Sequence, residues 1–106
     1  MAVLSVVTVE VAPGRMEDFL GAVRTLKAIE DRLAVNLRSM RLFEAEVAGE
    51  GTGRVSLVFE YADLGSWGTT VDQERQDTAF QTMMQSDPED EVVTIVDRAL
   101  YTELAF

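Results

Sequence analysis

Aromatic and thioether side chains gather in the second half of the chain, where they suit the wall of a ligand pocket. Flat rings and polarizable sulfur atoms favour an apolar or aromatic ligand. The competing interpretation is core packing, because apolar residues at helical spacing usually serve that purpose. Glycines close to the single tryptophan favour a mobile lid, since glycine destabilises a helix by about 1 kcal/mol. The residues concerned are Tyr61, Trp67, Phe80, Met83 and Met84, with glycines at 65 and 68.

Two charged residues, Arg41 and Asp97, fall within stretches expected to form strands. Alternation along those strands assigns both to the face that we expect the helices to cover. A charge buried there needs a partner or a function. Arg41 can bind a carbonyl or phenolate oxygen of a ligand, and Asp97 can act as a general base. The alternative is that each side chain reaches solvent at a strand end.

The sequence contains neither histidine nor cysteine. This excludes disulfides, cysteine nucleophiles and thiolate metal sites. It also excludes haem bound through histidine and the usual Ser-His-Asp triads. An acidic run at residues 87–91 lacks the spacing of an EF-hand calcium loop. The sequence therefore predicts no metal site and no cofactor, and leaves open whether the protein is an enzyme.

The charge of the chain is strongly acidic and unevenly distributed. The formal net charge is -10, and residues 55–106 hold two basic and eleven acidic side chains. Such a surface repels phosphates, so we expect neither nucleic acid nor an anionic membrane as a partner. The apolar N-terminal run ends at Glu10 without a basic region before it. It is therefore expected to be a strand rather than a signal peptide, in a cytoplasmic protein.

The hydrophobic pattern predicts one domain over residues 1–106. Valine-rich or alternating segments predict strands at residues 2–11, 36–47, 54–61 and 91–104. Helical spacing begins at Met16 and runs to about residue 30. A second helix starts after the N-cap Asp63, breaks near residues 70–76, and ends in a turn at residues 86–90. The predicted fold is therefore α+β, in the order β-α-β-β-α-β.

Both faces of the expected sheet carry apolar residues. Odd-numbered positions are the more apolar and aromatic, so we assign them to the helix side. Even-numbered positions form a smaller cluster on the other face: Val6, Met40, Leu42, Val58 and Val96. Two helices cover only one side of a four-stranded sheet, so this cluster predicts a homodimer through the sheet face. A single β-bulge would exchange the faces of a strand locally.

Several short segments resemble the dimeric α/β-barrel superfamily, whose members have a ferredoxin-like fold with a four-stranded antiparallel sheet. These segments are the turn at residues 11–15 before Met16-Glu17-Asp18-Phe19, the run Val58-Phe59-Glu60-Tyr61-Ala62-Asp63-Leu64, and Thr78-Ala79-Phe80-Gln81. Within the superfamily the chain is most similar to NIPSNAP-like proteins and to small antibiotic-biosynthesis-type monooxygenases. The resemblance implies a dimer with a ligand cavity between the sheet and the helices.

The resemblance leaves three functions open. The first is a small protein that binds an apolar or aromatic ligand. The second is a cofactor-independent monooxygenase or polyketide-cyclase-like enzyme acting on an aromatic or polyketide-like substrate. The third is a structural dimerisation module. The chain departs from the monooxygenase pattern, because Trp67 comes later than the usual tryptophan and the histidines of the second helix are missing.

Overall fold

The computed structural model describes residues 1–85 and 91–106. The predicted turn at residues 86–90 lies outside the described residues. The elements within them are β1 (Val3–Val11), α1 (Met16–Leu33), β2 (Leu37–Glu44), the short 3-10 helix η1 (Gly49–Gly51), β3 (Val55–Tyr61), α2 (Leu64–Gln76), α3 (Thr78–Met84) and β4 (Val93–Thr102). This order confirms the predicted succession of strands and helices.

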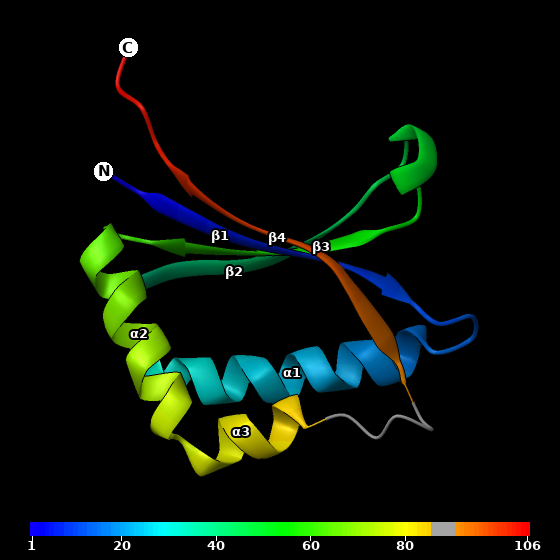
Figure 1. Ribbon diagram of the computed structural model, residues 1–106, viewed down its shortest axis with the longest axis horizontal. Coiled ribbons are helices and arrows are strands. Elements are labelled where there is room, and N and C mark those ends of the chain that lie inside the picture. The colour runs from blue at the N-terminus through cyan, green and yellow to red at the C-terminus, as the bar shows by residue number, and fades with distance from the viewer. Residues whose placement is uncertain (86–90) are drawn as a thin grey trace.

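The four strands form an antiparallel sheet in the order β2-β3-β1-β4. Figure 1 shows the sheet as one layer and the helices on one side of it, with α1 and α3 below the strands and α2 at one end. The predicted α+β, ferredoxin-like fold is thereby confirmed. None of the helices within residues 1–85 and 91–106 is long and apolar enough to cross a membrane.

Side-chain caps explain why the second helical region consists of two pieces. Asp63 caps α2, because its carboxylate accepts a hydrogen bond of 2.7 Å from the backbone N–H of Ser66. Asp77 ends α2 in an extended conformation and caps α3 by accepting from the N–H of Phe80 at 2.9 Å. The predicted break therefore occurs, at Asp77, one residue beyond the expected range.

The core lies between the sheet and the helices. Its buried cluster consists of Val9, Phe19, Val55, Leu57, Phe59 and Tyr61, with Trp67 and Met40 among the half-buried residues packed against it. Odd-numbered residues of β1 and β3 supply most of this cluster. On these two central strands, the assignment of odd positions to the helix side is confirmed.

On the two edge strands that assignment holds at Leu37, Val93 and Ile95, and it is wrong beyond the irregularity that each strand contains. In β2 the register shifts between Leu37 and Ser39, so that Met40 and Leu42 pair with Phe59 and Leu57 and face the helices. Arg41 pairs with Val58 and faces away from the helices. The predicted dimer cluster therefore loses Met40 and Leu42 to the helix side.

A second irregularity changes β4. Its register with β1 shifts between Thr8 and Val9, which leaves Val96 as an extra residue without a pairing position. Asp97 lies opposite Thr8, so it faces away from the helices, contrary to the prediction. Arg41 and Asp97 thus lie on the helix-free face, on opposite edge strands of the sheet.

Candidate functional site

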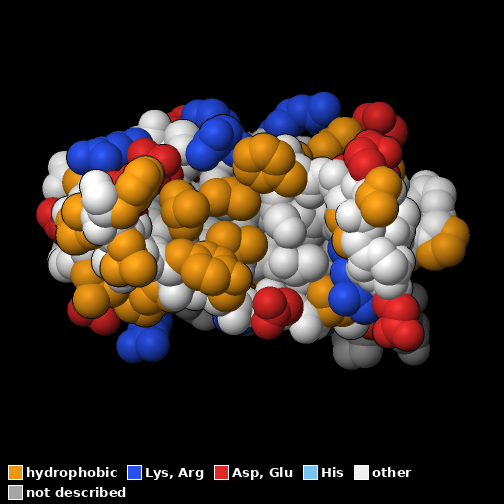
Figure 2. All heavy atoms as spheres, turned by 90° about the horizontal axis from the view of Figure 1, so that it is seen from above, with side chains coloured by type: hydrophobic (Ala, Val, Ile, Leu, Met, Phe, Trp, Pro, Cys, Tyr) orange, Lys and Arg blue, Asp and Glu red, His pale blue; other side chains and the backbone are white. Residues whose placement is uncertain are grey.

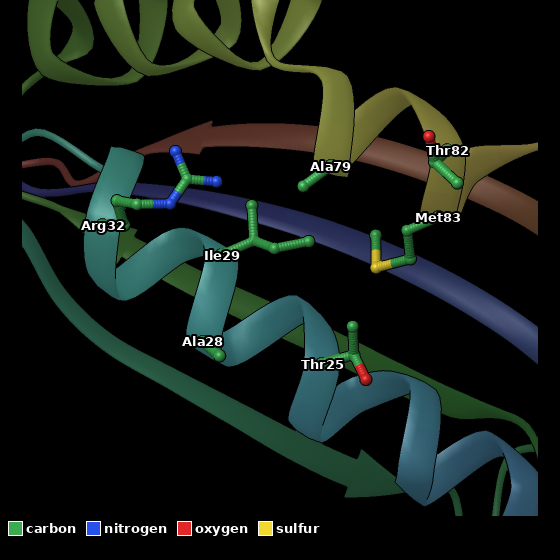
Figure 3. A pocket seen from close by; sticks show the side chains of 7 residues that line it. All are labelled: Thr25, Ala28, Ile29, Arg32, Ala79, Thr82 and Met83. Carbon is green, nitrogen blue, oxygen red and sulfur yellow. The ribbon is translucent and has the colours of Figure 1, made fainter.

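An open groove of about 580 Å³ separates α1 from α3. Its lining residues are Thr25, Ala28, Ile29 and Arg32 from α1, with Ala79, Thr82 and Met83 from α3. Figure 3 shows the side chains of Ala79 and Met83 directed from α3 toward Ile29 of α1. Small residues on both helices leave the space, and aliphatic and thioether groups make its walls apolar. The volume is in the range of ordinary small-molecule sites.

An ion pair joins the two helical regions at one end of the groove. The Arg32 guanidinium donates to both carboxylate oxygens of Asp77, at 2.9 and 3.1 Å. This contact lowers the pKa of Asp77 below its usual range, and the backbone N–H of Phe80 lowers it further. Arg32 is exposed and already bound to a carboxylate, so it offers only part of its hydrogen-bonding capacity to a ligand.

A carboxylic acid lies inside the protein, on the face of α1 that packs on the sheet. Glu30 is only 1% exposed, and neither of its carboxyl oxygens has a partner of ordinary hydrogen-bond geometry among the described residues. None of the sequence patterns described above singled out this residue. The sequence nevertheless carried a signal that position 30 is buried, because Phe19, Val23 and Leu26 continue at helical spacing to this position.

A carboxyl group from another element acts on Glu30, and Glu30 in turn acts on Tyr61. Burial raises the pKa of Glu30 to about 9, and the Glu74 carboxyl of α2 adds to the rise through hydrogen bonding and negative charge. In the structure, however, neither carboxyl oxygen of Glu30 makes a hydrogen bond of ordinary geometry with Glu74. Burial, followed by the charges of Glu30 and Glu74, also raises the pKa of the Tyr61 hydroxyl well above its usual value. Glu30 is therefore a neutral acid at neutral pH.

The sheet face opposite the helices carries apolar side chains on all four strands, and we call it the open sheet face. Its apolar residues are Leu4, Val6, Phe43, Val58, Ala99 and Tyr101, as the strand registers establish. Phe43 is 49% exposed and Tyr101 is 56% exposed. Figure 2 shows this face from above, with hydrophobic side chains gathered over its middle.

Charges on the open sheet face are nearly balanced, unlike those of the chain as a whole. Arg54 pairs with Glu10 at 3.0 Å, and Arg38 and Arg41 each lie 3.9 Å from Glu60. The Arg41 guanidinium also lies 5.5 Å from the centre of the Phe43 ring. Two copies of this face can therefore approach without strong repulsion.

The predicted ligand-binding residues are distributed over three environments. Tyr61 is buried in the core, and Trp67 is half-buried against it. Phe80 is half-buried on α3, whereas Met84 is exposed. Among the predicted lining residues, Met83 is the one that lines the groove. Arg41 lies across the sheet from the groove, so these residues do not form one wall.

No group of three or more metal-ligating side chains occurs within residues 1–85 and 91–106. Neither a family model nor a curated protein matches the sequence. Solved structures do match the fold over nearly the whole chain. A NIPSNAP family protein from Agrobacterium tumefaciens has a TM-score of 0.67 and 19% identity, and the match covers 99% of this chain and 86% of that one. This chain therefore shares the fold of that NIPSNAP family protein.

Two further structures show the same likeness. A NIPSNAP-like domain protein from Burkholderia xenovorans has a TM-score of 0.68 and 13% identity, with 99% of this chain and 87% of that one covered. A candidate antibiotic biosynthesis monooxygenase from Bordetella bronchiseptica has a TM-score of 0.64 and 21% identity, with 98% of both chains covered. The predicted resemblance to these proteins is confirmed at the level of the fold.

Proposed function

We propose that this protein works as a homodimer, joined through its open sheet faces, that binds a small apolar or aromatic ligand in the groove between α1 and α3. The observation that carries the dimer is the apolar, charge-balanced sheet face opposite the helices. Seen from above, the outline measures 38 by 18 Å between Cα atoms. The area of an outline with these dimensions is comparable to the roughly 800 Å² that each partner contributes to a stable interface.

An acidic chain needs such a surface if it is to bind a second copy of itself. The formal net charge of -10 opposes association through most of the molecule. On the open sheet face, by contrast, Arg38, Arg41 and Arg54 offset the charges of Glu10, Glu60 and Asp97. A two-fold axis through this face would bury Val6 and Val58, which pair across the two central strands.

Val58→Arg is expected to dissociate the dimer. The substitution places an unpaired charge at the centre of the interface, and two-fold symmetry doubles the effect. We expect the dissociation constant to rise by roughly a hundredfold or more, which corresponds to about 3 kcal/mol. Light scattering at micromolar concentration should give twice the 11.7 kDa chain mass for the wild type and the chain mass for the variant.

The matched control introduces the same charge elsewhere. Leu64→Arg changes an exposed apolar residue at the start of α2, away from the open sheet face, and should remain dimeric. Circular dichroism verifies that both variants are folded. A monomeric wild type, or dissociation of both variants alike, would rule out the proposed interface.

The ligand part of the proposal rests on the shape and chemistry of the groove. Its walls come from Ala28, Ile29, Ala79 and Met83, and the one charged group, Arg32, is bound to Asp77. Arg41 and Asp97 do not reach it, because they face away from the helices. This arrangement favours binding of an apolar body over acid–base catalysis, and it favours a ligand-binding protein over a purely structural module.

Ala79→Trp is expected to fill the groove and to block ligand binding. With 1-naphthol as an aromatic probe, we expect the melting temperature of the wild type to rise with probe concentration. The variant should bind at least about tenfold more weakly, a loss of roughly 1.4 kcal/mol. Thr69→Trp, on the exposed side of α2, adds the same ring outside the groove and should bind normally. Equal shifts in all three proteins would contradict the proposed site.

A further inference from the structure

Two charges of opposite sign lie at opposite edges of the open sheet face. Arg41 belongs to the edge strand β2, and Asp97 belongs to the other edge strand, β4. Both residues are exposed, and the apolar middle of the face lies between their strands (Figure 2). Neighbouring strands are about 4.8 Å apart, so roughly 14 Å separates β2 from β4. This distance is too long for an ion pair between Arg41 and Asp97 of the same subunit.

Neither charge is balanced within its own subunit. Arg41 and Arg38 each lie 3.9 Å from the same carboxylate, that of Glu60, so the β2 edge has a positive charge in excess. Asp97 makes no ion pair with any other group in the part of the chain that the structure describes. The cation next to it in the chain, Arg98, faces the helices, as its pairing position on β1 shows. The open sheet face is therefore positive along one edge and negative along the other.

Two copies of this face can be related by a two-fold axis that runs either across the strands or along them. An axis across the strands stacks each strand on its own copy. Arg41 is the pairing partner of Val58, and Val58 is that of Val6, so all three lie at one level of the sheet. An axis across the strands that stacks these valines therefore also brings Arg41 against the partner's Arg41. Like charges would then oppose each other at the β2 edge.

An axis along the strands brings opposite charges together instead. Because the strand order is β2-β3-β1-β4, this rotation stacks β2 on the partner's β4 and β3 on the partner's β1. Val58 then covers the partner's Val6, so the apolar centre is buried as well. Each positive edge meets a negative edge, on both sides of the dimer. Apolar contact and charge complementarity therefore favour the same arrangement.

The residues at these edges leave room for an ion pair between subunits. In this arrangement Arg41 lies opposite the partner's Ala99, because both residues are at the level of the central valines. Ala99 has a small side chain, and Asp97 is two residues away on the same face, about 7 Å along the strand. Packed sheets are about 10 Å apart, a gap that an arginine and an aspartate side chain can bridge together.

We propose that the two subunits pack with their strands aligned, so that Arg41 of each subunit pairs with Asp97 of the partner subunit. The proposal rests on the proposed dimer and adds to it the arrangement of the two copies. The paired charges lie at the edges of the interface, where they select orientation and partner more than they raise affinity. They let an acidic chain recognise its own copy, and they assign a role to two charged residues that do not line the groove.

Charge reversal at each edge tests this arrangement. Arg41→Asp should set two carboxylates against each other at both edges, and Asp97→Arg should set two guanidinium groups against each other. Each variant alone should form homodimers about tenfold more weakly than the wild type. In an equimolar mixture each edge of a heterodimer again holds one cation and one anion. Native mass spectrometry should then find about nine-tenths of the dimers mixed, against about half for random pairing.

A matched pair of variants controls for overall charge, because the two reversals change the net charge of the chain in opposite directions. Arg24→Asp and Asp72→Arg make the same changes at exposed positions of α1 and α2, away from the open sheet face. Their mixture should contain heterodimers at about the random share. Circular dichroism verifies that all four variants are folded.

The outcomes separate this arrangement from the dimer itself. A dimeric wild type whose Arg41→Asp and Asp97→Arg variants mix at random would overturn the aligned arrangement and leave the proposed dimer standing. Equal enrichment of heterodimers in the control mixture would also overturn it, because overall charge would then explain the preference. A monomeric wild type would refute the proposed dimer and this arrangement together.

Discussion

Glu30→Gln is expected to flatten the dependence of folding stability on pH. Between about pH 5 and pH 9, the wild type should lose about 1.4 kcal/mol of unfolding free energy per pH unit relative to the variant. From pH 6 to pH 8 the difference amounts to almost 3 kcal/mol, on the order of a hundredfold in the unfolding equilibrium. This is a large fraction of the roughly 5–15 kcal/mol that stabilises a typical domain.

The direction in which stability changes with pH follows from the pKa values of Glu30 in the unfolded and folded states. The ordinary value is 4.5, whereas burial and Glu74 raise the pKa in the folded protein to about 9. Between these values the folded protein holds a proton that the unfolded chain has released. Unfolding therefore releases a proton, and a higher pH favours it. The stabilisation is complete below pH 4.5 and is lost as the pH rises through 9.

Urea unfolding at fixed protein concentration, repeated at pH 6, 7 and 8, measures this slope. Glu46→Gln controls for the removal of one negative charge from an acidic protein, and its curves should run parallel to those of the wild type. If Glu30→Gln also runs parallel to the wild type, Glu30 does not hold a proton in the folded state.

Phe19→Ala is expected to cost about 3–5 kcal/mol of stability. Phe19 is 4% exposed and packs from α1 into the cluster that contains Phe59 and Tyr61. Truncation removes buried apolar area and leaves a cavity that the sheet cannot close, because β1 and β3 are the two central strands. The midpoint of urea unfolding should fall while the slope against urea stays the same.

Phe106→Ala is the matched control, since Phe106 is fully exposed at the C-terminal end. Its unfolding midpoint should move by less than about 0.5 kcal/mol when measured at the same protein concentration. A comparable loss from both substitutions would mean that Phe19 does not lie in a packed core.

The order of the elements could be predicted from local properties of the sequence. Valine-rich runs, the helical spacing that begins at Met16 and the N-cap at Asp63 are each set by neighbouring residues. The same holds for the break between α2 and α3, because Asp77 caps the second helix within a few residues. Local spacing also assigned the faces of the central strands correctly.

The faces of the edge strands could not be predicted in this way. Each irregularity is a property of a pair of strands, namely β2 against β3 and β4 against β1. One extra residue shifts the alternation by one position, which moved Arg41 and Asp97 to the open sheet face. The positions of the predicted aromatic residues likewise depend on packing between elements, since Tyr61 and Trp67 pack in the core while Met83 lines the groove between helices.

The sequence by itself determined the succession of strands and helices, the α+β class and the chemistry excluded by the missing histidine and cysteine. Only the tertiary structure decided which side chains meet. The approach of Glu74 to Glu30, the pairing of Arg32 with Asp77 and the exposure of Phe43 each depend on elements far apart in the chain. Periodicity reports the direction of a side chain within its own element, whereas contacts between elements depend on how those elements pack.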